Sequence, residues 1–148
     1  MEELCDEVVL KILSFLSIRE LLTCQQVSKR LQRLANDKTL WQRIKINLQE
    51  IPEELMKVMI KNGVKYLDLW SSNVPEISQK FLIDHQFDLK HLNLGSSKGS
   101  FDFLSSMISH SNSLTSLNLC ESRCDLVYMC IKKIPRTNCI KVRLYMLG

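Results

Sequence analysis

The feature that most constrains the fold is a six-residue pattern that recurs every 25 residues. Its form is apolar-x-x-apolar-x-apolar, and the last two apolar residues lie two positions apart, so on a strand they point to the same face. Such a period indicates stacked units that each add one strand to a shared core. A looser copy at residues 41–46 predicts a first strand near 44–46. Four clear copies predict strands at residues 64–69, 89–94, 114–119 and 139–144.

The pattern resembles the strand segment of leucine-rich repeats, whose units are 20–29 residues long. The resemblance implies an α/β solenoid with parallel strands on its concave face and helices on its convex face. Pro52 and Gly63 suit the two ends of the first returning helix. Ser72, Ser97 and Ser122 follow the strands, where a hydroxyl can bond loop backbone. The helices are expected at residues 52–61, 77–84, 101–110 and 126–134.

Residues 1–41 show the apolar spacing of three short helices. The first is predicted over residues 6–15, where apolar residues form a wide stripe at helical spacing. Ser17 and Glu20 form a capping box that begins the second helix. The third is predicted from about residue 26 to residue 35, and Asn36 and Asp37 end it.

Several motifs in this segment resemble an F-box. Three departures from the family pattern are Cys5 where proline is usual, Ser28 where cysteine is usual, and Leu31 where tryptophan is common. The resemblance implies an F-box at residues 1–41 and leucine-rich repeats at residues 42–148. The motifs that carry it are Leu4-Cys5-Asp6-Glu7, Ile12-Leu13-Ser14-Phe15-Leu16, Leu21-Leu22, Val27-Ser28-Lys29-Arg30 and Leu40-Trp41.

The combination resembles the F-box/leucine-rich-repeat class and implies a substrate-recognition subunit of an SCF-type (Skp–cullin–F-box) ubiquitin ligase. The F-box would bind a Skp-family adaptor, and through it a cullin and a RING protein. An alternative is a repeat scaffold outside ubiquitin transfer, in which the helices only cap the repeats. The expected adaptor-binding residues are Leu4, Cys5, Glu7, Val8, Ile12, Leu16, Leu21, Leu22, Val27 and Leu31.

A target protein is expected on the strand residues that alternate with the core positions. Trp70 is the first choice, because an aromatic side chain buries much area for little entropy. Packing of Trp70 against its own loop or the edge of the F-box is the alternative, and the polar column at 68, 93 and 118 could instead be a structural amide ladder. The expected target-binding residues are Tyr66, Asp68, Trp70, His91, Asn93 and Asn118.

The sequence lacks the residue groupings that catalysis requires. His85, His91 and His110 stand in no HExxH frame, and the four glycines form no phosphate loop. The cysteines at 120, 124, 130 and 139 lack the paired spacing of a zinc site, so ordinary thiols are expected. The sequence therefore predicts a non-catalytic protein with no cofactor and no metal.

The charge and the distribution of apolar residues limit the partners and the cellular location to be expected. A formal charge of +4 and a pI near 8.8 are too weak to predict nucleic-acid binding, and no apolar run reaches the ~18 residues of a membrane span. No secretory signal is recognisable at the start, so a cytoplasmic or nuclear location is expected. Residues 144–148 continue an apolar strand without a polar cap, which predicts either a fragment or short isoform, or a last edge that pairs with a partner. The target itself stays unknown.

Overall fold

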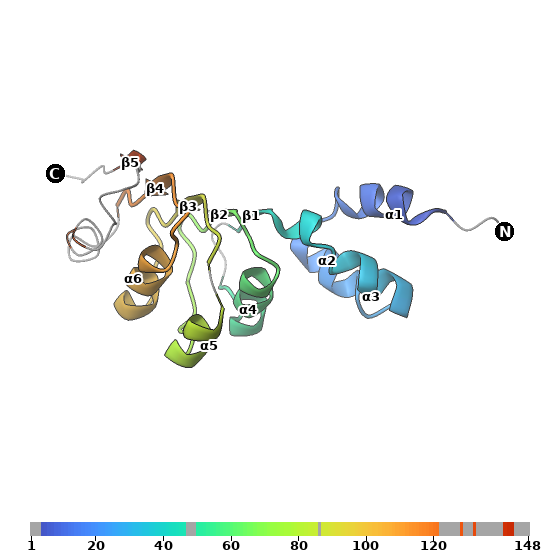
Figure 1. The fold of residues 1–148 in the computed structure, drawn as a ribbon, viewed down its shortest axis with the longest axis horizontal. Coiled ribbons are helices and arrows are strands. Elements are labelled where there is room, and N and C mark those ends of the chain that lie inside the picture. Colours follow the sequence, from blue (N-terminus) through green and yellow to red (C-terminus); the bar gives the residue numbers. More distant parts are fainter. Residues whose placement is uncertain are drawn as a thin grey trace. The chain divides into compact units, whose positions relative to one another are not determined.

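The computed structural model describes residues 4–46, 50–85, 87–121, 128, 132 and 141–143. The chain divides into two compact units, Met1–Gln42 and Arg43–Gly148 (Figure 1). The sequence places the boundary after residue 41, and the observed division falls after Gln42.

The first unit contains the three expected helices, followed by a short 3-10 helix. Ser17 Oγ accepts from the backbone N–H of Glu20, and the Glu20 carboxylate accepts from the N–H of Ser17 at 2.7 Å. This reciprocal pair is the capping box predicted from the sequence, and it fixes where the second helix begins. The helices are α1 (Asp6–Leu13), α2 (Ile18–Cys24) and α3 (Lys29–Ala35), and the 3-10 helix η1 spans Lys38–Trp41.

The third helix begins three residues later than the sequence pattern suggests. Ser28 is its N-cap, with extended backbone, and its hydroxyl accepts from the N–H of Leu31 at 3.1 Å. A residue with this conformation and this hydrogen bond is the N-cap, so the helix begins at the residue after it. Val27 therefore lies outside the helix, and its side chain is 69% exposed rather than aligned with Leu31 and Leu34.

A small apolar core holds the first unit together. Leu13, Leu21, Leu34 and Ala35 are buried at its centre, and Val9, Leu10, Leu16, Cys24 and Leu40 pack against them. Trp41 is fully buried, and its indole N–H donates to the carbonyl oxygen of Ala35 at 2.8 Å. A buried indole needs such a partner.

The second unit is built on a five-stranded parallel sheet in sequence order. Helices α4 (Glu53–Lys61), α5 (Gln79–Asp84) and α6 (Phe101–Ser109) lie together on one side of the row of strands (Figure 1). Asn62 ends α4, and Gly63 follows with φ of 68°, the left-handed conformation that favours glycine. The strands are β1 (Arg43–Lys45), β2 (Tyr66–Asp68), β3 (His91–Asn93), β4 (Ser116–Asn118) and β5 (Lys141–Arg143).

The strands are three residues long, shorter than the six-residue segments expected. The chain leaves the ladder early because it turns soon after each strand, and the N–H of Ser72 bonds back to Leu69 O. The equivalent bond joins Ser97 to Leu94. Leu69 and Leu94 still face inward and are fully buried, so the predicted apolar face is correct although the paired segment is shorter.

The backbone repeats the same local features at the same 25-residue spacing. Ser71, Ser96 and Glu121 all adopt positive φ, between 52° and 57°. Ser72 Oγ donates to Ile46 O at 2.7 Å, as expected for a hydroxyl at this position, and Ser97 Oγ donates to Leu94 O at 2.6 Å. The strands β2, β3 and β4 are thus each followed by a left-handed turn residue at the same position of the period.

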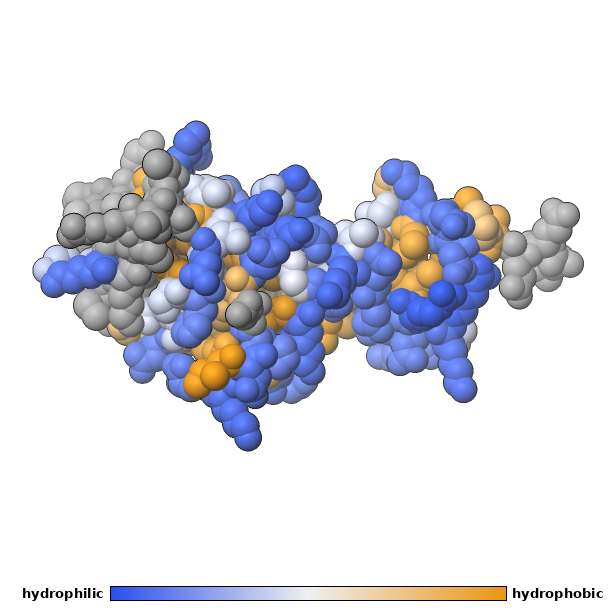
Figure 2. Space-filling view, viewed as in Figure 1, coloured by the Kyte–Doolittle hydropathy of each residue, from blue (hydrophilic) through white to orange (hydrophobic). Residues whose placement is uncertain are grey.

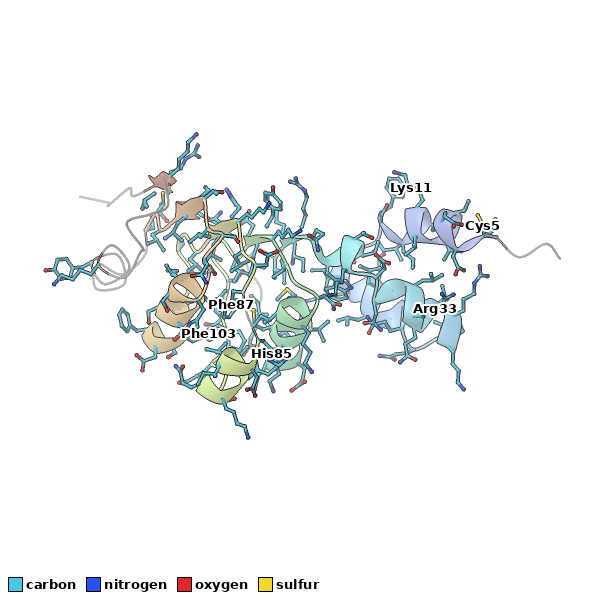
Figure 3. The ribbon with its side chains drawn as sticks, viewed as in Figure 1. Cys5, Lys11, Arg33, His85, Phe87 and Phe103 are labelled. Atoms are coloured by element: carbon cyan, nitrogen blue, oxygen red, sulfur yellow. The ribbon has the colours of Figure 1, made fainter. Side chains whose placement is uncertain are left out.

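The core of this unit lies between the sheet and the helices. The central strand residues Leu67, Leu92 and Leu117 are at most 1% exposed. Phe103, on α6, is equally buried (Figure 3). Of the helix expected at residues 126–134, the structure describes only residues 128 and 132, and both are helical. Ser122 and residues 139, 140 and 144–148 lie outside the described residues.

Candidate functional site

An exposed apolar surface runs along the first helix. Leu4, Val8, Ile12 and Phe15 follow one another at intervals of three or four residues, so they share one side of the helix and its extension. Their exposed fractions are 43–77%. Val27, which precedes α3, is exposed as well. Figure 2 shows hydrophobic surface over this unit. An exposed apolar cluster in a small unit is a candidate protein-binding surface.

The other expected adaptor-binding residues are placed differently. Leu21 is 3% exposed and belongs to the core, so its side chain stabilises the unit and is not presented to a partner. Leu16, Leu22 and Leu31 are half-buried. Cys5 and Glu7 are exposed beside the apolar surface. The helical pattern alone could not separate Leu21 from its neighbours, because the apolar residues of this segment point to more than one side.

An ionic cluster ties the first helix to the third. Arg30 donates to Asp6 Oδ1 from Nε at 2.9 Å and from Nη2 at 2.8 Å, and Arg33 donates to Oδ2 at 2.6 Å. Arg30 also donates to the carbonyl oxygen of Leu4. These charged donors lower the pKa of Asp6 below its usual value. The cluster, which includes the Arg33 labelled in Figure 3, therefore fixes the N-terminal end of the helix that carries the apolar surface.

On the second unit, the strand residues that alternate with the core form two rows across the sheet. They are half-buried or exposed. In the first row, the guanidinium of Arg43 lies 4.0 Å from the centroid of the Tyr66 ring, which stacks on His91 at 6.3 Å. The first row is Arg43, Tyr66, His91, Ser116 and Lys141, and the second is Lys45, Asp68, Asn93, Asn118 and Arg143.

In the second row, one side-chain bond joins two of the three positions at which the sequence raised a structural ladder as an alternative. Asp68 Oδ1 accepts from the N–H of Trp70 at 3.1 Å, and Asn93 and Asn118 accept in the same way from the N–H groups of Gly95 and Cys120, also at 3.1 Å. Asn93 Nδ2 donates to Asp68 Oδ1 at 2.8 Å. Each of these side chains holds its own turn, which leaves less of it for a ligand.

Trp70 is half-buried and its ring lies over Gly95. A Cβ atom at Gly95 would stand 2.2 Å from Cζ3 and 2.4 Å from Cε3 of Trp70. The ring therefore occupies the space that a side chain on the next repeat would fill. The contact is with the next repeat, which is neither Trp70's own loop nor the edge of the F-box, and it leaves Trp70 less accessible to a target than the exposed His91.

A hollow of about 430 Å³ lies at the end of the sheet formed by β1 and β2. Its side-chain lining is cationic and aromatic, with one carboxylate. Such a volume can accommodate a few side chains of a partner or a small ligand. The residues that line it are Arg43, Ile44, Lys45, Tyr66, Leu67, Asp68 and His91.

Three cysteines in the described ranges are free thiols. Cys5 is exposed, Cys24 is half-buried and Cys120 is buried. Cys124, Cys130 and Cys139 lie outside the described residues. Within the described ranges, no group of three or more His, Cys, Asp or Glu side chains is arranged to hold a metal ion. No helix in those ranges is long and apolar enough to cross a membrane.

The first unit corresponds in sequence to a known domain family. Residues 1–47 match the family model described as F-box-like. The match covers the three helices, the 3-10 helix and β1. No curated protein matches the chain. This match supports the interpretation of the chain as an F-box protein and suggests an adaptor-binding role of the kind typical of SCF subunits.

Two residues of these surfaces were missing from the sequence-based expectations. Phe15 is the most exposed residue of the F-box-like domain's apolar surface, at 77%, with Lys11 Nζ 5.3 Å from its ring centroid. Its position three residues after Ile12 was an available signal. Arg43 pairs with Tyr66 in the sheet, and the 23-residue spacing of the looser first repeat would have aligned the two.

Proposed function

We propose that the chain is a non-catalytic substrate receptor of an SCF-type ubiquitin ligase. Its F-box-like domain binds a Skp-family adaptor, which connects it to a cullin and a RING protein, and its repeat sheet binds a target. The single observation that carries the proposal is the exposed apolar surface of Leu4, Val8, Ile12 and Phe15 on a segment that matches an F-box-like family.

The repeat part of the proposal is a leucine-rich-repeat solenoid over residues 42–148. Its support is the recurrence of several backbone features at one spacing: parallel three-residue strands, side-chain-held turns at 68, 93 and 118, and positive φ at 71, 96 and 121. The open side of the sheet is the one opposite the helices. Its paired strands present side chains in fixed rows, which supports a partner-binding role for this side.

The receptor contributes position rather than chemistry. Holding a target beside a ligase raises the effective concentration of the target's lysines at the transfer site. Such a protein needs two binding surfaces and no catalytic constellation. We place it in the cytoplasm or nucleus with the adaptor.

The test is recovery of a purified Skp-family adaptor and cullin by the tagged full chain. The decisive variant carries Val8→Lys and Ile12→Lys, two exposed positions where lysine should leave the fold intact. Two desolvated ammonium groups in an apolar interface should weaken adaptor affinity about 100-fold or more. The control is Ile83→Lys, which makes the same change at an exposed isoleucine of α5, 73% exposed against 49% for Ile12.

Circular dichroism verifies that all variants are folded. Recovery by the wild type and by Ile83→Lys, with loss in the double variant, is the expected result. No recovery by folded wild type would refute the receptor function and favour a scaffold in which the helices serve as a cap. Recovery unchanged by the double variant would show that the adaptor uses another surface.

A further inference from the structure

The open side of the repeat sheet carries an unusual distribution of charge. Its two end strands contribute four cations, two from β1 and two from β5, whereas the three middle strands contribute one carboxylate, Asp68. The Asp68 carboxylate is already engaged by Trp70 N–H and Asn93 through Oδ1, and Lys45 Nζ lies 4.0 Å from Oδ2. The ten residues of the two rows are therefore cationic at both ends and nearly neutral between.

Arg43 is held in a conformation suited to an anionic ligand. Its guanidinium carbon lies 4.0 Å from the centroid of the Tyr66 ring, and this cation–π contact restrains the group without using its N–H donors in an ion pair. Among the described residues, no carboxylate lies within ion-pair distance of Arg43. An arginine that is positioned by an aromatic ring and borders a hollow can form a bidentate pair with an incoming carboxylate.

Lys45 adds a second cation to the same hollow. Its side chain is 69% exposed, and its contact with Asp68 is long for an ion pair. The rings of Tyr66 and His91 form the adjoining wall and offer apolar contact beside the charges. This combination suits a short acidic stretch with a neighbouring apolar or aromatic residue.

We propose that this surface binds an acidic segment of the target protein, with one acidic group in the hollow at Arg43 and Lys45 and a second at Lys141 and Arg143. The proposal rests on the proposed function for the identity of its partner as a ligase target. Four strand spacings separate the two cationic ends, roughly 19 Å. An extended segment covers that distance in about six residues, which sets the spacing of its acidic groups.

A single-stranded nucleic acid fits this distribution less well. Its backbone carries a charge at every nucleotide, and each would need a cation along its path. The middle of the sheet instead presents the rings of Tyr66 and His91, the Asp68 carboxylate and amide or hydroxyl groups, none of which supplies a row of cations. A protein segment that is acidic at two places and neutral between them matches the pattern of the sheet.

The test measures fluorescence anisotropy of a labelled twelve-residue peptide with the full chain at low salt. The peptide carries a pair of glutamates on each side of a neutral stretch, and a second peptide has glutamine at all four positions. Arg43→Glu combined with Lys45→Glu should weaken binding of the acidic peptide at least tenfold. The matched control is Lys80→Glu, which reverses one exposed charge on α5.

Three results would overturn the proposal: no measurable binding of the acidic peptide by folded wild type, equal binding of the glutamine peptide, or tighter binding of a twelve-nucleotide single strand. Adaptor recovery is measured on the same proteins. Failed peptide binding with intact adaptor recovery would refute this inference alone. Failed adaptor recovery with intact, charge-dependent peptide binding would refute the ligase function and leave an acidic-peptide receptor.

Discussion

The contact between Trp70 and Gly95 makes a sharp stability prediction. Replacing Gly95 by alanine places a methyl group 2.2 Å from one ring carbon of Trp70 and 2.4 Å from another. Normal carbon–carbon contact is about 3.5–4.0 Å, so the ring must move by more than 1 Å. Such overpacking typically costs about 1–3 kcal/mol.

Whether Gly95→Ala lowers or raises the free energy of unfolding should depend on whether the Trp70 ring is present. Alanine restricts the unfolded chain and by itself stabilises by about 0.4–1 kcal/mol where the backbone allows it. In a Trp70→Ala background the ring contacts vanish, and the closest remaining neighbour is the carbonyl oxygen of Cys120 at 3.2 Å. Gly95→Ala should then be neutral or slightly stabilising. The coupling energy between the two sites should be at least the cost of the overpacking, about 1–3 kcal/mol.

The assay is native-state hydrogen exchange of the β3 amides, which reports the free energy of opening the sheet where the change is made. Gly99→Ala is the control, because its new methyl group would approach Val74 and Leu104 and no tryptophan. Its effect should be equal in both backgrounds. Equal effects of Gly95→Ala in both backgrounds would refute the packing argument and return Trp70 to the set of accessible target contacts.

Three further outcomes test the other contacts. Ser17→Ala removes the capping box and should lower the stability of α2 by about 1 kcal/mol, measured by hydrogen exchange of its amides; unchanged exchange would contradict the capping role. The arginines of α3 lower the pKa of Asp6, so its carboxylate stabilises the folded state fully above the unfolded pKa, near 4. This stabilisation is lost as pH falls through the lower pKa of the folded state. Asp6→Asn should therefore make the free energy of unfolding less dependent on pH below about pH 4, measured by denaturant unfolding at several pH values. Asn93→Asp would place a second carboxylate against Asp68 and should destabilise the sheet at pH 7 but much less at pH 3; a pH-independent effect would argue against the ladder.

The sequence by itself determined the repeat and its inward face. A strict 25-residue period of apolar residues fixes which side of each strand is buried, because side chains alternate and a core must be continuous. Leu67, Leu92 and Leu117 are buried in register as that reasoning requires. The capping box at Ser17 was equally readable, since it depends on residues three positions apart.

Properties that depend on distant neighbours were decided only by the tertiary structure. Leu21 and Phe15 are both apolar residues in short helical stretches, yet packing buries the first and exposes the second. Arg43 meets Tyr66 because the strands pair in a particular register. Trp70 is restrained by a glycine 25 residues away in the chain. Periodicity reports the direction of a side chain relative to its own backbone, whereas exposure and partners depend on what the rest of the chain places beside it.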